Sequence, residues 1–242
     1  MAQINKPTDY FNTLLYTGND TSQSLTGVGF QPDWTWIKCR SNNENHANYD
    51  SVRGATKHLI NNLGNAEVTR SNGLTSFDSD GFSVGSENDV NDGTQTFASW
   101  NWKAGGTPSS NTDGTITSSV SANTTAGFSV GTYSGNSTSD ATVGHGLSSA
   151  PEMVIVKTRD RTDNWQVYWN PGTERNGFWN ITNAFNTPAA TAQWGTNVPT
   201  SSVFYVGNDS STNTGNDYVF YAFHSVKGYS KFGEFTGNGN AD

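Results

Sequence analysis

The sequence PDWTWIKCR, at Pro32–Arg40, recurs as PEMVIVKTR at Pro151–Arg159. Both copies begin with proline and an acidic residue and end in Lys-x-Arg. Proline is tolerated at the first position of a strand, where its missing N–H is not needed. In the first copy the tryptophans fall on one face of an extended chain, and Ile37 and Cys39 fall on the other. Because both faces carry apolar residues, we predict a central strand covered on both sides, in a module that occurs twice.

Shorter matches in the same order extend the repeat. Tyr16–Asn19 (YTGN) corresponds to Tyr133–Asn136 (YSGN), and Phe82–Gly85 (FSVG) corresponds to Phe204–Gly207 (FYVG). The copies are separated by roughly a hundred residues, the size of one small domain, so we interpret the pattern as tandem duplication and not as a solenoid. A third version, FTGN, stands at Phe235–Asn238. We expect it to form a strand that closes the second module; the alternative is the start of a third copy.

The composition is typical of a folded, turn-rich β protein. The 242 residues include 26 Gly and eight Trp but only 14% charged residues, and the formal net charge is −8. The aromatic residues supply the apolar surface that disordered chains lack, and the acidic balance argues against a nucleic-acid partner. Cys39 is the single cysteine, so no intrachain disulfide can form. With no secretory signal and no apolar run of membrane-spanning length, we expect synthesis in a cytoplasm and no membrane insertion.

Turn signals divide the chain into short strands. Asn72-Gly73, Asp80-Gly81 and Asp92-Gly93 combine residue types that accept positive φ and therefore favour hairpins. Strands at roughly ten-residue spacing with turns between them predict a sandwich or jelly roll. The only stretch with a helical pattern is Ala55–Leu63, and that pattern is ambiguous. We predict an all-β fold of two tandem homologous β-sandwich modules, of the jelly-roll or lectin-like type.

The repeat divides the chain into three segments. We predict that residues 1–106 form module 1 and that residues 126–242 form module 2. Residues 107–125 are nearly all Ser, Thr, Asn, Gly and Asp, and the repeat gives them no counterpart. We interpret them as a linker, which can donate one strand through Thr115–Val120.

Two motifs match a catalytic pattern, but their context favours a structural role. Gly81–Gly85 and Gly127–Gly131 both read G-x-S-x-G, the pattern of a nucleophile elbow. An elbow needs a helix after its serine, whereas turn-rich β sequence follows both copies, so we expect strands with an outward-facing serine. Carboxylates for sugar hydrolysis are present, but nothing places two of them face to face, and we predict no catalytic residue. These carboxylates are Asp33, Asp50, Glu152 and Glu174.

Oxygen-rich loops are the weak indication of a metal site. Asp78–Gly81 is followed by Asn88–Gly93, and carboxylate and amide oxygens are the ligands that calcium prefers. The EF-hand spacing is missing here and in Asn208–Asp217, so hairpin turns are the favoured interpretation and calcium the weaker alternative. The four histidines lack the i, i+4 spacing of a zinc site, and Cys39 is alone. We therefore predict no metal and no cofactor.

Tryptophans in the second half are the main indication of a ligand. Four of them, with Trp194 the last, lie in polar, loop-like sequence, whereas those of module 1 lie on predicted strands. Sugars offer a flat C–H face that stacks on indole rings and hydroxyls that bind amides, so we predict a glycan site within Asn164–Asn180. Its candidate residues are Trp165, Trp169, Trp179, Asn164, Asn170 and Asn180. The competing interpretation is that the tryptophans turn inward or form a subunit interface.

The motifs together resemble a known family. GVGFQPDWTWIKCRS, SFDSDGFSVGS, WNWKAGG, GHGLSSAPEMVIVKTR and GYSKFGEFTGNG look like a repeated domain of bacteriophage tail-fibre and other exterior virion proteins. The resemblance covers about Tyr10 to Asn240 and implies concanavalin-type, jelly-roll-like β-sandwiches. It also implies a place on the virion exterior after synthesis in the bacterial host's cytoplasm, with other virion proteins as partners. It supplies no active site that maps onto this chain residue by residue.

These patterns favour a structural over a catalytic protein. We expect an exterior virion protein, a tail or fibre component or a capsid decoration, that acts as a display or host-adhesion platform and binds a host cell-surface glycan. The alternative is a polysaccharide-degrading virion enzyme, a depolymerase, motivated by tryptophans near Asp163, Glu174 and Asp209. Fibre and decoration proteins repeat by symmetry, so we also expect a homo-oligomer, with a trimer as the first expectation.

Overall fold

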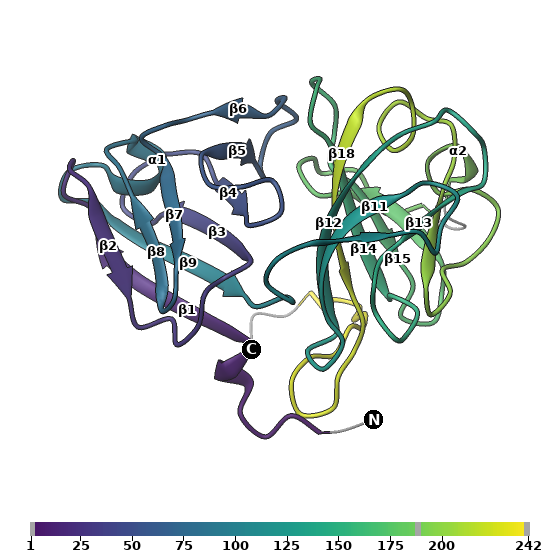
Figure 1. The fold of residues 1–242 in the computed structure, drawn as a ribbon, viewed down its shortest axis with the longest axis horizontal. Helices are drawn as coiled ribbons and strands as arrows, with labels where there is room; N and C mark the ends of the chain where they lie inside the picture. The colour runs from purple at the N-terminus through teal and green to yellow at the C-terminus, as the bar shows by residue number, and fades with distance from the viewer. Residues whose placement is uncertain (1–2, 187–189, 240–242) are drawn as a thin grey trace.

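The computed structural model describes residues 3–186 and 190–239 as two lobes of β-sheet (Figure 1). An N-terminal lobe contains the strands β1 to β9, and a C-terminal lobe contains the strands β10 to β18. Helix in the described residues is limited to short turns: η1 (Pro7–Asp9), α1 (Asn88–Asn91) and α2 (Thr191–Trp194). No helix of this part of the chain is long and apolar enough to cross a membrane. The all-β prediction is therefore confirmed, and the arrangement is consistent with β-sandwiches.

Each lobe combines one large sheet with one small sheet. The large N-terminal sheet has the order β1 (Phe11–Thr17), β9 (Thr96–Trp102), β3 (Trp34–Cys39), β4 (Ala47–Asp50), β5 (Lys57–Ile60), β6 (Val68–Thr69). The small N-terminal sheet has the order β2 (Gln23–Thr26), β8 (Gly81–Val84), β7 (Leu74–Asp78). The large C-terminal sheet has the order β10 (Ser109–Asn111), β11 (Ser118–Asn123), β12 (Phe128–Ser134), β18 (Asp217–Phe223), β14 (Met153–Thr158), β15 (Gln166–Trp169), β16 (Arg175–Phe178). The small C-terminal sheet joins β13 (Ala141–Gly144) to β17 (Val203–Val206).

The two predicted core strands, β3 and β14, are both central. β3 lies between β9 and β4, and β14 lies between β18 and β15, so each has hydrogen-bonded neighbours on both edges. The first residues of the two strands have matching registers, because Trp34 pairs with Trp102 of β9 and Met153 pairs with Phe223 of β18. The order β1-β9-β3-β4-β5 in one large sheet thus corresponds to the order β12-β18-β14-β15-β16 in the other.

Three apolar clusters explain why these strands are apolar on both faces. Ile37 and Cys39 face the small N-terminal sheet, and Val154 and Val156 face the small C-terminal sheet, so each lobe has a core of its own. The opposite faces meet between the lobes in a third cluster, which we call the interlobe core. Its principal members are Trp34, Leu59, Ile155, Trp165, Val167 and Tyr221. The two-faced pattern therefore reflects one face packed within the lobe and the other packed against the second lobe.

Polar contacts join the lobes beside the interlobe core. The hydroxyl of Tyr221 in β18 donates to Asp50 at 2.7 Å and accepts from Asn48 at 2.8 Å. Glu67 of the N-terminal lobe accepts two hydrogen bonds from the Arg159 guanidinium, at 3.0 and 2.9 Å, and one from Arg53 at 3.0 Å. Because these charges are largely withdrawn from water, they fix the relative position of the lobes more firmly than exposed pairs do.

A buried asparagine holds a corresponding turn in each lobe. Asn91 and Asn213 are fully buried, and each side-chain amide lies within hydrogen-bond distance of three oxygens. The acceptors are Asn19, Thr21 and Gly85 for Asn91, and Asn136, Thr138 and Gly207 for Asn213. The repeated YTGN and YSGN sequences therefore end in the same kind of turn, fastened in the same way.

The structure corrects two expectations for local elements. Ala55–Leu63, the stretch with a helical pattern, contains strand β5, which pairs with β4 and buries Leu59 between the lobes. Phe235–Asn238, expected to close module 2 as a strand, lies in residues 231–239, which form no strand. The Phe235 side chain is 94% exposed, so the aromatic residue of this motif is not buried as a closing strand of the sandwich would require.

Two other regions are placed in detail. Residues 107–125 contribute β10 and β11, which extend the large C-terminal sheet beyond β12. The G-x-S-x-G motifs both form strands, as the structural interpretation required, in β8 and β12. Ser83 is partly exposed, whereas Ser129 is fully buried, so the prediction of an outward-facing serine is wrong for Ser129. The reason is that both faces of β12 are covered, one within its lobe and one at the lobe interface.

Candidate functional site

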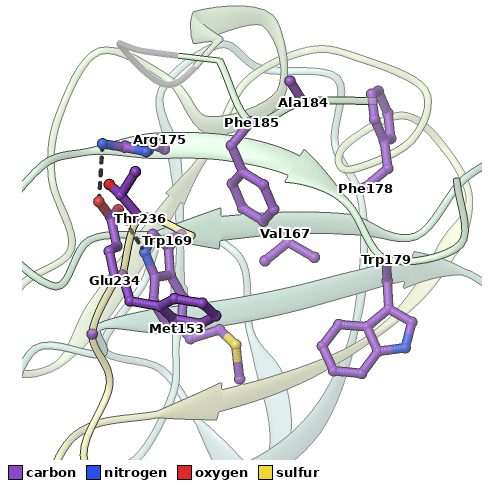
Figure 2. Close-up of a pocket in the computed structure, with 12 residues that line it drawn as sticks. Met153, Val167, Trp169, Arg175, Phe178, Trp179, Ala184, Phe185, Glu234 and Thr236 are labelled. Atoms are coloured by element: carbon purple, nitrogen blue, oxygen red, sulfur yellow. Dashed lines mark hydrogen bonds and ion pairs between the residues drawn. The ribbon is translucent and has the colours of Figure 1, made fainter. Parts of the chain in front are cut away.

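A large groove lies on the outer face of β14, β15 and β16. The N-terminal lobe covers only part of this face, and a groove of about 960 Å³ remains beside it. Its lining, drawn in Figure 2, is Met153, Val167, Trp169, Arg175, Phe178, Trp179, Ala184, Phe185, Gly233, Glu234, Phe235 and Thr236. A volume of this size is in the range of about 300–1,000 Å³ that is typical of ligand sites.

Strand register assembles the floor of the groove. Met153 of β14 lies opposite Trp169 of β15, and Trp169 lies opposite Arg175 of β16. Directly opposed residues on neighbouring strands project from the same face, so these three side chains stand in a row across the sheet. Gly177 lies opposite Val167, and a Cβ at Gly177 would come within 2.9 Å of the Phe185 ring. The missing side chain therefore lets Phe185 lie close over the sheet, above Val167 in Figure 2.

Charged groups close one end of the groove. The Arg175 guanidinium forms an ion pair with Glu234 at 3.0 Å, and the Trp169 indole N–H donates to the same carboxylate at 3.1 Å. The Phe232 ring packs edge-on against Trp169, with 5.9 Å between the ring centroids. Residues 231–239, which form no strand, therefore complete the groove, because Phe232 contacts Trp169 of β15 and Glu234 pairs with Arg175 of β16. Figure 2 shows Glu234 between Arg175 and Trp169.

The predicted tryptophans separate into two groups. Trp169 and Trp179 line the groove, and Trp169 is the last residue of a strand and not part of a loop. Trp165 is only 2% exposed, and its indole N–H donates to main-chain carbonyls of the other lobe. Trp194 is 1% exposed and packs against Tyr168 in the core of its own lobe. The prediction of exposed loop tryptophans is therefore wrong for Trp165 and Trp194, whose surroundings look polar only along the sequence.

The predicted asparagines support the hairpin around the groove. The Asn180 amide donates to the Asn164 side-chain oxygen at 2.9 Å, and the Asn180 oxygen accepts from the Trp165 main chain at 2.9 Å. Asn170 donates to the Tyr168 hydroxyl at 3.3 Å, and its oxygen accepts from the following turn. Burial raises the pKa of Tyr168, so this phenol stays protonated. None of the three asparagines is part of the groove lining.

Carboxylates discussed from the sequence lie apart from the groove. Asp33 accepts hydrogen bonds from the amides of Ala104 and Gly106, and burial raises its pKa despite them. Glu152, at the corresponding place, accepts from the Ser225 amide at 2.5 Å. Both acids therefore fasten the chain at the end of a core strand, through main-chain amides and not through a lysine or arginine.

The carboxylates proposed for a depolymerase have separate structural contacts. Asp163 accepts from the Ser210 hydroxyl, and Asp209 accepts from the Ser211 amide and hydroxyl. Glu174 lies close enough to Tyr168 to influence its pKa. These contacts give Asp163 and Asp209 structural roles in their loops, and neither residue lines the groove.

The oxygen-rich loops are likewise engaged in turns. Asp78 accepts from the hydroxyls of Ser76 and Ser83, and Asp80 accepts from the amides of Gly27 and Gly29. In residues 3–186 and 190–239, no three His, Cys, Asp or Glu side chains are grouped so that they could hold a metal ion. Asp78–Gly81 joins the paired strands β7 and β8, as the hairpin interpretation required. Asn88–Gly93 instead contains helix α1 and connects strands of different sheets, so it is not a hairpin turn.

Sequence reasoning missed four residues that shape the groove: Met153, Arg175, Phe185 and Glu234. Arg175 and Glu234 carried no pattern, because they are distant in the sequence and meet only when the C-terminal segment crosses β16. A signal for Phe185 existed in Gly177, since a glycine inside a strand often marks a close approach by another group.

One protein-family model, described as "Domain of unknown function (DUF7483)", matches residues 6–242. No curated protein and no solved structure matches the chain. Because the family model spans nearly the whole sequence, the chain belongs to this family.

Proposed function

We propose that this protein binds a glycan in the groove over β14, β15 and β16, and that it does so on the exterior of a bacteriophage virion as a tail, fibre or decoration component. The observation that carries the binding function is the combination of aromatic rings with a charged pair on an open sheet face. Trp169, Trp179 and Phe185 offer apolar ring surface, and Arg175 and Glu234 offer donors and acceptors at one end. The virion location is supported by the sequence resemblance alone.

Sugar chemistry fits this combination better than other ligand chemistries. A pyranose has an apolar C–H face that packs on an aromatic ring and a rim of hydroxyls that both donate and accept. The carboxylate of Glu234 accepts hydrogen bonds, and the guanidinium of Arg175 donates them, so the pair can serve both roles of a hydroxyl. A nucleic acid would instead need a basic surface, and the net charge of −8 opposes it.

We further infer that the two lobes arose by tandem duplication of one sandwich module. Three observations support this history: the corresponding strand orders, the two buried asparagines with corresponding acceptors, and the two acids that fasten core strands. The proposed modules are residues 1–106 and 126–242. On this view the N-terminal copy acts as scaffold, because its corresponding sheet face is covered by the C-terminal lobe, and the C-terminal copy binds the ligand.

Assembly is the remaining part of the proposal. Exterior virion proteins act in symmetric copies, so we propose a homo-oligomer, with a trimer first, that contacts other virion proteins. Light scattering at high protein concentration measures this directly, and a monomeric mass would reject it. Mass spectrometry of purified virions tests the location, and failure to find the chain there would reject the virion role.

A glycan array tests the binding function. The full chain should bind at least one bacterial surface polysaccharide, and a Trp169→Ala variant should lose most of that signal. The matched control is Leu15→Ala, which removes an exposed apolar side chain from β1 of the other lobe and should bind like the wild type. Binding that survives Trp169→Ala unchanged would place the site elsewhere.

A further inference from the structure

We infer that the groove opens into a second, apolar pocket that takes a short alkyl or acyl group carried by the bound saccharide. The pocket lies between the lobes and has a volume of about 260 Å³. The saccharide part of this inference rests on the proposed function, whereas the apolar part rests on the pocket itself. The ligand class that follows is a saccharide with one short apolar substituent.

The pocket is lined almost entirely by rings and hydrocarbon. Its walls come from both lobes, with Trp34 and Trp102 on one side and Ile155 and Phe223 on the other. The full lining is Phe11, Trp34, Trp36, Trp102, Ala126, Met153, Ile155, Trp179, Phe223, Tyr229, Ser230 and Phe232. The Ser230 hydroxyl, a polar group of the lining, accepts from the Val226 amide at 3.2 Å. A bare sugar would lose its hydrogen bonds to water here without replacement, so the pocket selects an apolar group.

The pocket and the groove are adjacent. Met153 and Trp179 line both of them, so these two side chains form the border between the spaces. Figure 2 shows them on the side of the groove opposite Phe178 and Ala184. Trp36 and Trp179, whose rings lie 5.5 Å apart, are only half-buried, so this edge of the pocket is reachable from solvent. A ligand whose polar part rests on Trp169 can therefore extend its apolar part past Met153.

The pocket volume limits the length of the substituent. Drug-sized ligands occupy pockets of about 300–1,000 Å³, and this pocket lies just below that range. It has room for one short chain and not for the two long chains of a membrane lipid. We therefore assign the substituent to a soluble, acylated or alkylated saccharide and not to a glycolipid embedded in a bilayer.

A series of alkyl glucosides tests the pocket. Methyl, butyl, hexyl and octyl β-D-glucoside are titrated below their critical micelle concentrations, with tryptophan fluorescence and calorimetry as the readouts. Each methylene that enters the pocket should tighten binding about three- to fourfold, until the pocket is full. The fluorescence should change with chain length, because four tryptophans line the pocket.

Two variants test whether the gain in affinity per methylene arises in this pocket. Ala126 lines the pocket but not the groove, so Ala126→Leu should fill it and abolish the chain-length increment while methyl glucoside binds as before. Phe11→Ala should enlarge the pocket and shift the optimum to a longer chain. Because Phe11 is only half-buried, this second variant gives a test even where the leucine at position 126 prevents folding.

The outcomes separate this inference from the proposed function. If methyl glucoside binds and chain length does not change the affinity, alkyl binding in the pocket is rejected and sugar binding in the groove is supported. If butyl and octyl glucosides bind with the predicted gain in affinity per methylene and methyl glucoside does not bind, alkyl binding in the pocket is supported and sugar binding in the groove is rejected. If none of the four glucosides binds, the assignment of the pocket to an alkyl group is wrong. It is also wrong if the gain in affinity with chain length persists in Ala126→Leu. Co-sedimentation with phosphatidylcholine vesicles that contain a long-chain glucosyl lipid would overturn the assignment to a soluble ligand.

Discussion

The outer face of the large C-terminal sheet has one part that the N-terminal lobe covers and one part that is open. Trp165 lies in the covered part, and Trp169, four residues later, lies in the open part. Trp165 precedes β15 under the N-terminal lobe, and its indole N–H donates to the carbonyls of Ile60 and Leu63, at 2.9 and 3.1 Å. Trp169 ends β15 beyond the edge of that lobe, and its indole N–H donates to Glu234. The two side chains have the same chemistry, so the position of the second lobe decides which one is structural and which one can meet a ligand.

The two large sheets extend the same comparison. The outer face of the N-terminal sheet is covered where Trp34 stacks on Tyr221, with 4.4 Å between the ring centroids. The outer face of the C-terminal sheet is covered at Tyr221, Ile155 and Val167 but open at Trp169 and Arg175. The same contact between the lobes therefore covers β4 and β5 of one large sheet and leaves part of β15 and β16 of the other open.

The largest expected loss of stability comes from a change at Trp165, in the part of the sheet face that the N-terminal lobe covers. Trp165→Ala should destabilise the protein by about 3–5 kcal/mol, because it leaves a cavity in the interlobe core and removes the indole N–H that donates to the carbonyls of Ile60 and Leu63. Urea denaturation of wild type and variant measures the difference. A loss below about 1 kcal/mol would mean that the lobes do not depend on this contact.

The second-largest loss of stability is expected from a change at Glu67, which forms the ionic contact between the lobes. Glu67→Gln keeps the shape but removes the charge that faces Arg53 and Arg159, and hydrogen bonds to charged groups contribute about 1.5–3 kcal/mol. The expected loss of stability is of that size, and equilibrium unfolding measures it. Glu44→Gln, a charge change at a half-buried loop position whose carboxylate accepts a long hydrogen bond from Asn42 at 3.4 Å, is the control and should leave the unfolding free energy almost unchanged.

The same carboxylate predicts a pH dependence. Burial raises the pKa of Glu67, but the hydrogen bonds and charges of Arg159 and Arg53 outweigh it, so the pKa in the folded state lies below the ordinary value of 4.5. The stabilisation is therefore complete above about pH 4.5 and is lost as pH falls through the lower, folded-state value. Unfolding free energies measured from neutral pH downward should show this loss in the wild type and a smaller one in Glu67→Gln. Identical pH profiles would contradict the contact.

A smaller effect is expected where Phe185 lies over the sheet. In Gly177→Ala the added methyl would meet the Phe185 ring at 2.9 Å, so the ring must move. Because Phe185 is 42% exposed it can shift towards solvent, and the stability change should stay near 1 kcal/mol or less. Glycan affinity should change more than stability does. A stability loss of several kcal/mol would mean that Phe185 is part of the fold and not of the binding surface.

The smallest stability effect is expected at the charged end of the groove. Glu234→Gln removes the ion pair with Arg175, whose side chain is 34% exposed, and exposed pairs contribute about 0–1 kcal/mol. Thermal denaturation should barely distinguish the variant from the wild type, while glycan affinity falls because an acceptor for sugar hydroxyls is weakened. Unchanged affinity would remove Glu234 from the binding surface.

The fold was predictable where the sequence pattern is local. Apolar residues on both faces of Pro32–Arg40 and Pro151–Arg159 predicted central strands covered on both sides. The strands found there, β3 and β14, are central, and both of their faces are covered. Of the three turns predicted as hairpins, Asp80-Gly81 joins the paired strands β7 and β8. Asn72-Gly73 and Asp92-Gly93 instead connect strands of different sheets, so the hairpin prediction is wrong for these two. The helical pattern of Ala55–Leu63 misled, because Leu59 is buried by the second lobe and not by a neighbouring turn of helix.

The site was only half predictable, because long-range contacts decide it. Trp169 and Trp179 were identified as ligand candidates and line the groove, whereas Trp165 was identified by the same reasoning and is core. Trp165 differs from Trp169 because its indole N–H donates to carbonyls of the other lobe, and a local sequence pattern does not predict such a contact. Glu234 was missed for the same reason, since its segment reaches β15 without forming a strand.

The most direct test is the affinity of Trp169→Ala for a polysaccharide that the wild type binds on the array, measured by calorimetry beside its unfolding free energy. We expect binding to weaken at least about tenfold, because an aromatic anchor of this kind contributes more than 1.4 kcal/mol. We expect stability to fall by about 1–2 kcal/mol, clearly less than for Trp165→Ala, because the indole is only half-buried. Unchanged affinity, or a loss of stability as large as that of Trp165→Ala, would contradict the assignment of the open face to ligand binding.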